Sequence, residues 1–410
     1  MTRDTDTHLV VIGNGMAGHR LVTTLLARKD RPARITVLGE EASHAYNRIL
    51  LSPWLAGELG RDELALPAMV AEGVECRPGA RVINIDRSSH TLTLESGERL
   101  HYDRLVIATG ARPTLPEVAG IQLGNVGAFR TMEDGEWLRQ QAPGSNAVVI
   151  GGGLLGLEAA EGLRKLGMHV TVLQRSDRLM NRQLDAVAAG WLKQTLTRRG
   201  ITIDTGAELA RLDGDSNGNV RSLTLRDGRT LAADCVVVAA GITPNATLGQ
   251  LAGLEVGRGI CVDEHLATRD PAIFALGECA EVDGATIGLV EPIWQQVETL
   301  ADVLCHRTPV PYQALPSPTR LKVAGIDLYA FGPVEPSEGM ETLTYADPEH
   351  GDYRRLLIDN DRIKGAVLYG DTRDGPDLFR LATNGTALGE ARSLLIFGAH
   401  DAIQQLEEAA

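Results

Sequence analysis

Two segments of the chain repeat one arrangement of an apolar run, three glycines and a helical stretch. They read "HLVVIGNGMAG" and "AVVIGGGLLGLE", and each glycine of the second follows its counterpart by 138 residues. The six glycines are Gly13, Gly15, Gly18, Gly151, Gly153 and Gly156. A strand that enters G-x-G-x-x-G and then a helix is typical of a dinucleotide-binding βαβ unit. The chain is therefore predicted to contain two such units.

The three glycines of such a unit have different physical roles. The first permits a tight turn, the second lets the backbone approach a pyrophosphate, and the third lets the helix pack close to the strand. The helix N-terminus then offers free N–H groups and partial positive charge to the phosphates. In the first unit, Glu40 lies 22 residues after Gly18, where a carboxylate accepts hydrogen bonds from ribose hydroxyls. Glu41 is the alternative for that role.

A longer stretch also repeats after each unit. Residues 91–110, "TLTLESGERLHYDRLVIATG", match residues 222–241, "SLTLRDGRTLAADCVVVAAG", at nine of twenty positions. Alternating polarity, a glycine turn and a closing apolar run predict an antiparallel meander with a return strand. We therefore predict an α/β fold with two Rossmann-like domains. A small α+β domain without a nucleotide motif follows, with a hairpin around 359–361 and a helix near 375–385.

Composition narrows the classes of partner. The 40 basic and 54 acidic residues give a net charge of −14, which argues against nucleic acid or an anionic membrane as the main partner. No apolar run approaches the roughly 18–20 residues of a membrane span. The five cysteines are widely spaced, with no C-x-x-C pair, which favours a reducing cytoplasm and offers no zinc or iron–sulfur ligand spacing. We expect a cytoplasmic protein without a metal site.

Short motifs carry a resemblance to a known superfamily. These motifs are "ATG" (108–110), "GITPN" (241–245) and "ALGE" (275–278). Together with the glycine sets they resemble, over residues 8–305, the two-dinucleotide-binding-domain flavoprotein oxidoreductases, which include glutathione, rubredoxin and ferredoxin reductases. The segments "YNRILLS" (46–52), "RLMNRQLD" (178–185) and "GAVLYGDT" (365–372) resemble a narrower group. That group comprises the flavoprotein part of assimilatory NAD(P)H nitrite reductase and the electron-transfer subunit of assimilatory nitrate reductase.

The resemblance implies a domain plan and two cofactors. FAD belongs to a discontinuous domain of residues 1–112 and 243–310, and NADH or NADPH to residues 113–242. Residues 319–410 correspond to the C-terminal interface domain, which often forms a homodimer in the superfamily.

The absence of a cysteine in one segment separates this chain from the disulfide reductases. Those enzymes carry reactive cysteines just after the first FAD motifs, where this chain reads "HAYNRILLSPWLAGELG" (44–60). Disulfide exchange requires a thiolate nucleophile, so we do not expect that chemistry. Electrons that reach the flavin are expected to leave for a redox centre on a separate metalloprotein.

The resemblance assigns the flavin-proximal residues. Arg48, with Ser52 in the same motif, corresponds to a cation near flavin N5, where positive charge stabilises the anionic reduced flavin. Trp294, followed by Gln295, corresponds to a tryptophan beside the flavin, with a packed core tryptophan as the alternative. The remaining FAD contacts are the strand-end residues Thr109, Gly110, Gly277 and Glu278. Glu278 departs from the broader superfamily, which has aspartate there.

In the second unit, Glu158 corresponds to the glutamate that faces the nicotinamide carboxamide, and with Arg48 it completes the predicted catalytic pair. Gln174 ends the second strand, where NADH enzymes usually have an acid. Arg175 and Arg178 lie close by in sequence, and a base there suits a 2′-phosphate. The residues leave NADH and NADPH open, and the resemblance favours NADH.

The predicted function is an FAD-dependent NAD(P)H:acceptor oxidoreductase that feeds an assimilatory nitrate or nitrite reductase component. With no siroheme domain in this sequence, we do not expect this chain alone to reduce nitrite. A rubredoxin or ferredoxin reductase of another pathway is the first alternative. An NADH oxidase that uses oxygen directly is the second, and a redox sensor that binds FAD and NADH is the third.

Overall fold

The computed structural model describes residues 7–314, 316–323 and 325–408, and its contacts divide the chain into two compact units. The first unit comprises Met1–Trp54, Leu59–Pro113 and Ile242–Leu315. The second comprises Leu55–Glu58, Thr114–Gly241 and Pro316–Ala410. The predicted domain ranges include residues 1–6, 324 and 409–410, which lie outside the described residues. The assignment of a cofactor to each range stays a prediction.

The first unit is built on a parallel sheet with the strand order β19-β7-β1-β2-β3. Its strands are β1 (His8–Ile12), β2 (Arg34–Leu38), β3 (Val74–Arg77), β7 (Arg104–Ile107) and β19 (Ile273–Ala275). Residues of β1 alternate between two apolar cores: Leu9 and Val11 face one, and Val10 and Ile12 face the other. A strand buried on both faces in this way is typical of parallel sheets covered on both sides.

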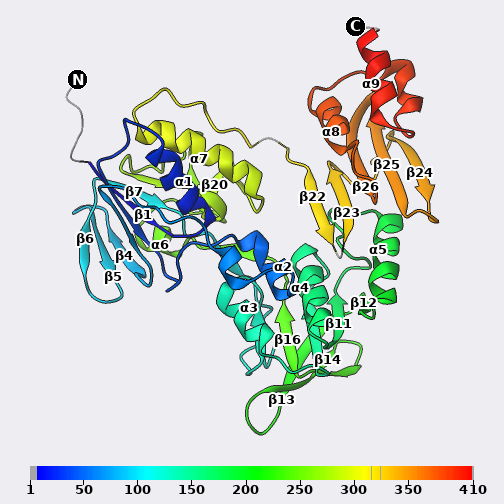
Figure 1. The fold of residues 1–410 in the computed structure, drawn as a ribbon, viewed down its shortest axis with the longest axis horizontal. Helices are drawn as coiled ribbons and strands as arrows, with labels where there is room; N and C mark the ends of the chain where they lie inside the picture. Colours follow the sequence, from blue (N-terminus) through cyan, green and yellow to red (C-terminus); the bar gives the residue numbers. More distant parts are fainter. Residues whose placement is uncertain (1–6, 315, 324, 409–410) are drawn as a thin grey trace. The chain divides into compact units, whose positions relative to one another are not determined.

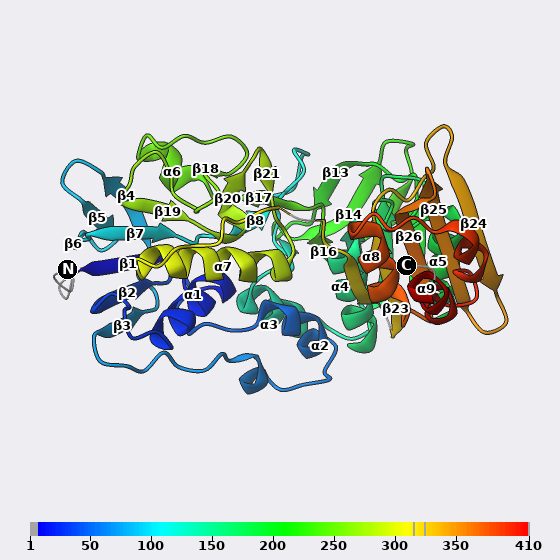
Figure 2. The ribbon, with the colours of Figure 1, turned by 90° about the horizontal axis from the view of Figure 1, so that it is seen from above.

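Two helices cover one face of this sheet. Helix α1 (Met16–Leu26) follows the first glycine turn, and α7 (Val290–Leu304) packs beside it although it lies far along the chain (Figures 1 and 2). Their apolar faces share one core with the sheet. The chain after residue 242 is therefore needed to complete the first sheet and its helical layer.

A meander covers the other face of the sheet, and shorter elements complete the unit. The predicted antiparallel meander is confirmed as β4 (Val82–Asp86), β5 (Thr91–Leu94) and β6 (Arg99–His101). The remaining elements are η1 (Arg48–Leu50), α2 (Leu51–Leu55), η2 (Arg61–Leu64), α6 (Thr247–Leu251), β18 (Ile260–Val262), η3 (Gly277–Cys279), β20 (Ala280–Val282) and β21 (Ala285–Thr286). Strands β8 (Ala111–Pro113) and β17 (Ile242–Pro244) pair antiparallel where the chain leaves and re-enters the unit.

The second unit repeats the same plan. Its parallel sheet has the order β12-β11-β10-β16-β9. The strands are β9 (Val126–Ala128), β10 (Asn146–Ile150), β11 (His169–Gln174), β12 (Thr202–Thr205) and β16 (Cys235–Val238). The helices are α3 (Met132–Arg139), α4 (Leu154–Lys165) and α5 (Ala186–Arg198), and the meander is β13 (Leu209–Gly214), β14 (Val220–Leu225) and β15 (Thr230–Ala232). The two predicted Rossmann-like folds are thus confirmed, each with its meander and return strand.

The C-terminal part of the second unit is an antiparallel sheet with helices, as predicted. Its order is β22-β23-β26-β25-β24, and α8 (Gly375–Thr383), η4 (Gly389–Leu394) and α9 (Ala399–Glu408) share one apolar core with it (Figure 1). The strands are β22 (Thr319–Val323), β23 (Ile326–Phe331), β24 (Glu341–Asp347), β25 (Asp352–Asp359) and β26 (Arg362–Tyr369). The predicted hairpin joins β25 to β26 through Asn360 and Asp361, both with positive φ.

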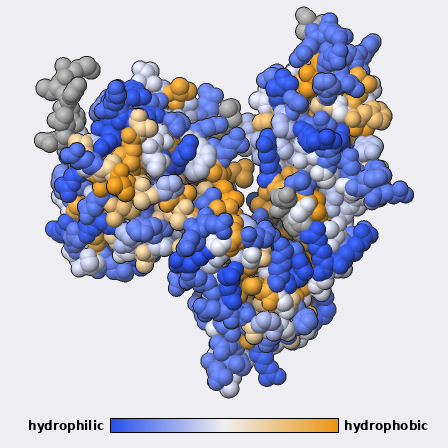
Figure 3. All heavy atoms as spheres, in the orientation of Figure 1, coloured by the Kyte–Doolittle hydropathy of each residue, from blue (hydrophilic) through white to orange (hydrophobic). Residues whose placement is uncertain are grey.

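Figure 3 shows polar and apolar side chains interspersed over the face that it draws. Within the described residues, no helix has the length and apolar character needed to cross a membrane.

Candidate functional site

The first glycine turn joins β1 to α1 and has one open position. Gly13 has φ +117°, and a Cβ there would lie 2.1 Å from the carbonyl oxygen of Ala108. A Cβ on Gly18 would lie 2.1 Å from the carbonyl oxygen of Gly13. At Gly15, by contrast, no heavy atom of the described residues, apart from those of its chain neighbours, lies within 4 Å of the position of a Cβ. The first and third glycines are therefore required by backbone packing, while the second leaves a cradle in front of the helix N-terminus.

A buried amide beside this cradle has no hydrogen-bond partner among the described residues. Both polar side-chain atoms of Asn14, which lies between the first two glycines, are buried and unpaired. A buried unsatisfied polar group costs about 1–3 kcal/mol, and a polar ligand in the turn offsets that cost. The open position and the orphaned amide together fit a bound dinucleotide.

The other predicted FAD residues meet at the same edge of the sheet. Thr109 and Gly110 follow β7, and Gly277 and Glu278 follow β19, the strand paired with it. The carboxyl ends of parallel strands form the ligand crevice of open α/β sheets. A Cβ on Gly110 would lie 3.6 Å from a carboxylate oxygen of Glu278, and one on Gly277 would lie 3.2 Å from the Cβ of Ala17 on α1. The structure thus brings these four residues beside the glycine turn.

Two amides that were not among the predicted residues hold these strand ends in place. Asn245 donates from Nδ2 to the carbonyl of Thr109 at 2.9 Å, and the Thr109 hydroxyl donates to the carbonyl of Asn245 at 2.8 Å. Gln296, 1% exposed on α7, accepts from the N–H of Gly277 at 2.8 Å. Asn245 is the last residue of the "GITPN" motif, which was a usable signal. Gln296 had no such signal, because its role depends on how α7 packs.

The paired acids after β2 have different partners. Glu41 accepts hydrogen bonds from the Tyr46 hydroxyl at 2.7 Å and from the Arg48 guanidinium, which also lies 5.1 Å from the centroid of the Tyr46 ring. Glu40 is 70% exposed and forms an ion pair with Arg81 at 3.2 Å. Both oxygens of Glu41 are therefore engaged within the protein. This favours Glu40 as the ribose ligand and shows what holds the predicted flavin-proximal Arg48.

Trp294 lies half-buried on α7 and packs against the core shared with α1. The guanidinium of Arg20, on α1, lies 5.5 Å from the centroid of its ring. Trp294 therefore helps to join the two helices that flank the first turn. Its predicted place beside the flavin stays a prediction.

The second glycine turn has the same geometry as the first. Gly151 has φ +121°, and a Cβ there would lie 2.3 Å from the carbonyl oxygen of Ala239. A Cβ on Gly156 would lie 1.9 Å from the carbonyl oxygen of Gly151, and the position at Gly153 is open within 4 Å. The second unit therefore has the same kind of cradle at the N-terminus of α4.

Both backbone groups of Gly152, between these glycines, are bound by residues at the end of β11 and in the segment that follows it. Its N–H donates to Oε1 of Gln174 at 2.8 Å, and its carbonyl accepts from the N–H of Met180 at 2.9 Å. Met180 is buried and has φ +46°, a backbone conformation that residues other than glycine rarely adopt. The motif "RLMNRQLD", which contains Met180, therefore packs directly on the glycine turn.

The remaining predicted residues of the second unit lie around this turn. Glu158 is half-buried on α4, five residues after Gly153. Arg175 is exposed. Arg178 is engaged with the carboxylate of Glu335 at 2.8 Å and with the carbonyl of Leu184 at 3.2 Å. Gln174, placed at the strand end as predicted, points its amide back at the turn.

A buried carboxylate at the end of the same motif ties it to the C-terminal sheet. Asp185 is fully buried and caps α5 by accepting from the N–H of Ala188 at 3.0 Å. The same carboxylate accepts from the Tyr353 hydroxyl and from the Arg355 guanidinium at 2.7 Å, both on β25. Trp191, one turn along α5, packs edge-on against the ring of Tyr353. Sequence reasoning missed this network because its members lie about 170 residues apart.

The five cysteines are all unpaired, and none is fully exposed. Desolvation raises the pKa of Cys235 to about 12 and raises the pKa of Cys76, Cys279 and Cys305 above the usual value. A raised pKa leaves less thiolate at neutral pH.

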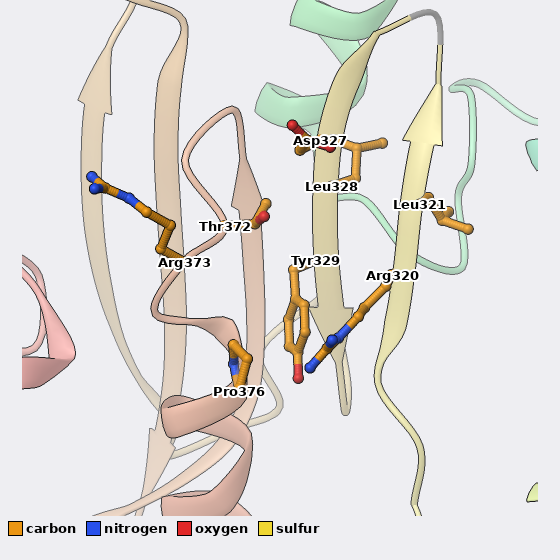
Figure 4. A pocket seen from close by; sticks show the side chains of 8 residues that line it. All are labelled: Arg320, Leu321, Asp327, Leu328, Tyr329, Thr372, Arg373 and Pro376. Carbon is orange, nitrogen blue, oxygen red and sulfur yellow. The ribbon is translucent and has the colours of Figure 1, made fainter. Parts of the chain in front are cut away.

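A hollow of about 370 Å³ lies on the C-terminal sheet, beside the start of α8 (Figure 4). Its lining includes Arg320, whose guanidinium stacks 5.3 Å from the centroid of the Tyr329 ring. None of the predicted site residues lines it.

Comparison with known proteins connects these two cradles to a family. Residues 7–301 match the family described as pyridine nucleotide-disulphide oxidoreductase, and residues 316–386 match the C-terminal domain of rubredoxin NAD⁺ reductase. The chain is similar to the assimilatory nitrate reductase electron transfer subunit of Bacillus subtilis, with 37% identity over 370 residues, covering 89% of this chain and 48% of that protein. It is similar to nitrite reductase [NAD(P)H] of the same organism, with 36% identity, covering 95% of this chain and 48% of that protein. The chain thus spans about half the length of these relatives.

A solved structure matches over nearly the full chain. The structure of the covalent putidaredoxin reductase–putidaredoxin complex has a TM-score of 0.87 and 27% identity, covering 99% of each chain. Putidaredoxin reductase of Pseudomonas putida is 32% identical over 317 residues, covering 74% of this chain and 75% of that protein. With the family match extending over most of the sequence, the chain belongs to the pyridine nucleotide-disulphide oxidoreductase family.

Proposed function

We propose that this protein is an FAD-containing NAD(P)H:acceptor oxidoreductase that passes electrons to a separate redox metalloprotein. The observation that carries the proposal is the pair of open glycine cradles, each at a helix N-terminus and each at the carboxyl edge of its own parallel sheet. One chain with two such sites suits two dinucleotides. The similarity to the nitrate reductase electron transfer subunit and to nitrite reductase supports a nitrate or nitrite reductase component as the acceptor.

The residues of the first unit are proposed to bind FAD. The Gly13–Gly18 turn and the N-terminus of α1 hold the pyrophosphate, Asn14 donates to a polar group of the ligand, and Glu40 accepts from the ribose. Thr109, Gly110, Gly277 and Glu278 line the continuation of the crevice along the strand ends. Asn245 and Gln296 act as positioning residues, because they fix the backbone of these strand ends.

The residues of the second unit are proposed to bind the nicotinamide cofactor. The Gly151–Gly156 turn holds its pyrophosphate, and Glu158 orients its carboxamide. When both cofactors are bound, they supply hydride transfer from nicotinamide C4 to flavin N5, which moves two electrons that then leave for the acceptor. Arg48, held by Glu41 and Tyr46, offers positive charge for the anionic reduced flavin.

The cysteines support an acceptor other than a disulfide. Catalytic disulfide exchange uses an accessible thiolate with a lowered pKa. In this chain the pKa of four of the five thiols is raised by burial, and the segment after the first FAD motifs contains no cysteine. Five unpaired cysteines also support a reducing cytoplasmic setting.

A ferredoxin reductase of another pathway is the second candidate. It is favoured by the match to the putidaredoxin reductase complex, which covers 99% of both chains, including the C-terminal sheet. The two candidates share the hydride-transfer step and differ in the protein that accepts the electrons.

The test is an anaerobic visible spectrum of the purified protein before and after one equivalent of NADH or NADPH. We expect a yellow protein whose flavin band bleaches within the mixing time. A colourless protein, or a flavin that neither nucleotide reduces, contradicts the proposal. Titration of the reduced protein with a ferredoxin and with a nitrate reductase catalytic subunit then separates the two candidates by which one reoxidises the flavin faster.

A further inference from the structure

We propose that the second cradle selects NADPH over NADH, with Arg175 as the residue that binds the 2′-phosphate. The inference rests on the proposed function, since it names the reduced nucleotide of that site. It runs against the preference for NADH that the family resemblance implies.

The two copies are the first and second glycine turns with the strands that follow them. One hydrogen bond that both copies contain aligns them residue by residue. The N–H of the first glycine donates to the carbonyl of the last buried residue of the next strand, at 2.8 Å in both copies: Gly13 to Leu38 and Gly151 to Leu173. Counting onward from that bond, Gly39 corresponds to Gln174, and Glu40 corresponds to Arg175. The position of the ribose-binding acid in the first copy therefore carries a guanidinium in the second.

The neighbouring position does not supply an acid either. Gln174 is neutral, and its amide is already used, because Oε1 accepts from Gly152 and Nε2 donates to the hydroxyl of Ser176. An acid at this edge binds the two ribose hydroxyls of NADH and repels the dianionic 2′-phosphate of NADPH. In the second copy neither Gln174 nor Arg175 is an acid, so neither position repels the 2′-phosphate.

Arg175 is also the guanidinium of this turn that is available to a ligand. It is exposed, and within the described part of the chain it has no hydrogen bond or ion pair. Arg178, the other predicted base, is engaged with Glu335 and with the carbonyl of Leu184. A guanidinium presents parallel N–H donors that match phosphate oxygens and stays charged at all working pH values.

The experiment compares the FAD-bound wild-type protein with Arg175→Gln, Arg175→Glu and a matched control, Arg221→Glu. Arg221 is an exposed arginine on β14 of the same unit, so it makes the same change of charge outside the cradle. Steady-state reduction of ferricyanide gives kcat/KM for NADPH and NADH. Calorimetry with 2′,5′-ADP and with 5′-AMP, which lacks only the 2′-phosphate, measures the phosphate contact without any redox step.

We expect the wild-type ratio of kcat/KM for NADPH over NADH to exceed ten. It should fall about 100-fold in Arg175→Glu and somewhat less in Arg175→Gln, and stay within twofold in Arg221→Glu. The advantage of 2′,5′-ADP over 5′-AMP should disappear in the Arg175 variants alone. A wild-type protein that prefers NADH and binds 2′,5′-ADP and 5′-AMP equally overturns the inference, as does an equal loss in Arg221→Glu. If neither nucleotide reduces the flavin while 2′,5′-ADP still binds through Arg175, the proposed function fails and the phosphate site stands.

Discussion

The two glycine turns have the same backbone conformation but differ at one contact, where a glycine faces a residue with an amide side chain. The glycine follows the second strand in the first turn and lies between the motif glycines in the second. In the first copy Asn14 lies opposite Gly39, whose Cβ would come within 2.9 Å of the Asn14 Cβ. In the second copy Gly152 lies opposite Gln174, with a corresponding distance of 3.1 Å. One of the two positions must therefore be bare for the other to carry an amide. Among the described residues the Asn14 amide has no hydrogen-bond partner, whereas the Gln174 amide is bound within its turn. A ligand in the first cradle can therefore satisfy a protein amide, and a ligand in the second does not need to.

The copies also differ in how their sheets are completed. The fifth strand of the first sheet, β19, follows the inserted second copy in the sequence. The fifth strand of the second sheet, β9, lies within the insert and directly precedes the other strands of its sheet. The second copy is tied in addition to the C-terminal sheet through Asp185. The two units thus share one arrangement of strands and helices but are held by different contacts. Substitutions at matched positions should distinguish the two sets of contacts.

Alanine at the third glycine should damage each copy separately, with the largest effect. The added methyl would lie 2.1 Å from a backbone oxygen at Gly18 and 1.9 Å at Gly156, so the helix must move away from its strand. We expect the unfolding free energy of the affected unit to fall by about 3 kcal/mol or more. Gly18→Ala should purify without FAD, and Gly156→Ala should keep FAD and lose reduction by nucleotide. Absorbance and urea unfolding measure both effects, and equal loss of FAD in the two variants would contradict the separation.

Removal of the buried carboxylate should destabilise the second copy. Asp185→Ala leaves the half-buried Arg355 without its short ion pair and leaves α5 without its cap. The expected loss of unfolding free energy is roughly 3 kcal/mol, measured by urea unfolding. Glu335→Gln is the control, because that carboxylate is 51% exposed and lies 3.7 Å from Arg355, where a loss of less than about 1 kcal/mol is expected. Similar losses in both variants would mean that the buried Asp185–Arg355 ion pair stabilises the unit no more than the exposed Glu335–Arg355 pair does.

Valine at the second glycine should separate binding from folding. Gly15 and Gly153 have φ of −86° and −83°, which any residue adopts. Apart from their chain neighbours, no atom in the described part of the chain lies within 4 Å of a Cβ at either position. Both variants should fold with urea midpoints close to that of the wild type, while the side chain occupies the cradle. We expect at least a tenfold weaker affinity, about 1.4 kcal/mol, for FAD in Gly15→Val and for the reduced nucleotide in Gly153→Val. Fluorescence titration of the apoprotein and stopped-flow reduction measure the two affinities, and unchanged binding would show that the dinucleotides lie elsewhere.

The paired acids of the first copy should differ by a smaller factor. Glu40→Gln weakens the proposed ribose contact, and we expect the Kd of FAD to rise several-fold, by roughly 1 kcal/mol. Glu41→Gln should have less effect on that Kd, because Glu41 already binds Tyr46 and Arg48. It should instead slow flavin reduction by loosening Arg48. A larger loss of FAD from Glu41→Gln than from Glu40→Gln would reverse the assignment of the ribose ligand.

The sequence predicted the repeated parts well because each repeat is local. The strand, the glycine turn, the helix and the meander follow one another within about 100 residues, so spacing and alternation reveal them. The three-residue strand β9 carries too little pattern to be assigned without the sheet that it joins. The equally short β19 was predicted as the strand before Gly277, but its pairing with β7 was not. The partners of Arg48 and Asp185 were also beyond reach, because side-chain contacts depend on how separate segments pack. The positions of the predicted site residues were visible in the motifs, and their supports were not.

The origin of β19 has a consequence for how the protein is made. On the ribosome, β7 is synthesised long before β19 and α7, and the entire inserted copy emerges between them. At the usual 5–20 residues per second, that interval is roughly ten to thirty seconds. Throughout it, one edge of the first sheet is unpaired and α1 lacks its partner helix α7, which is the situation in which nascent chains aggregate or engage chaperones. All five strands of the inserted sheet lie within the insert. We therefore expect that sheet to complete first, and the first sheet, although most of it is synthesised earlier, to complete later.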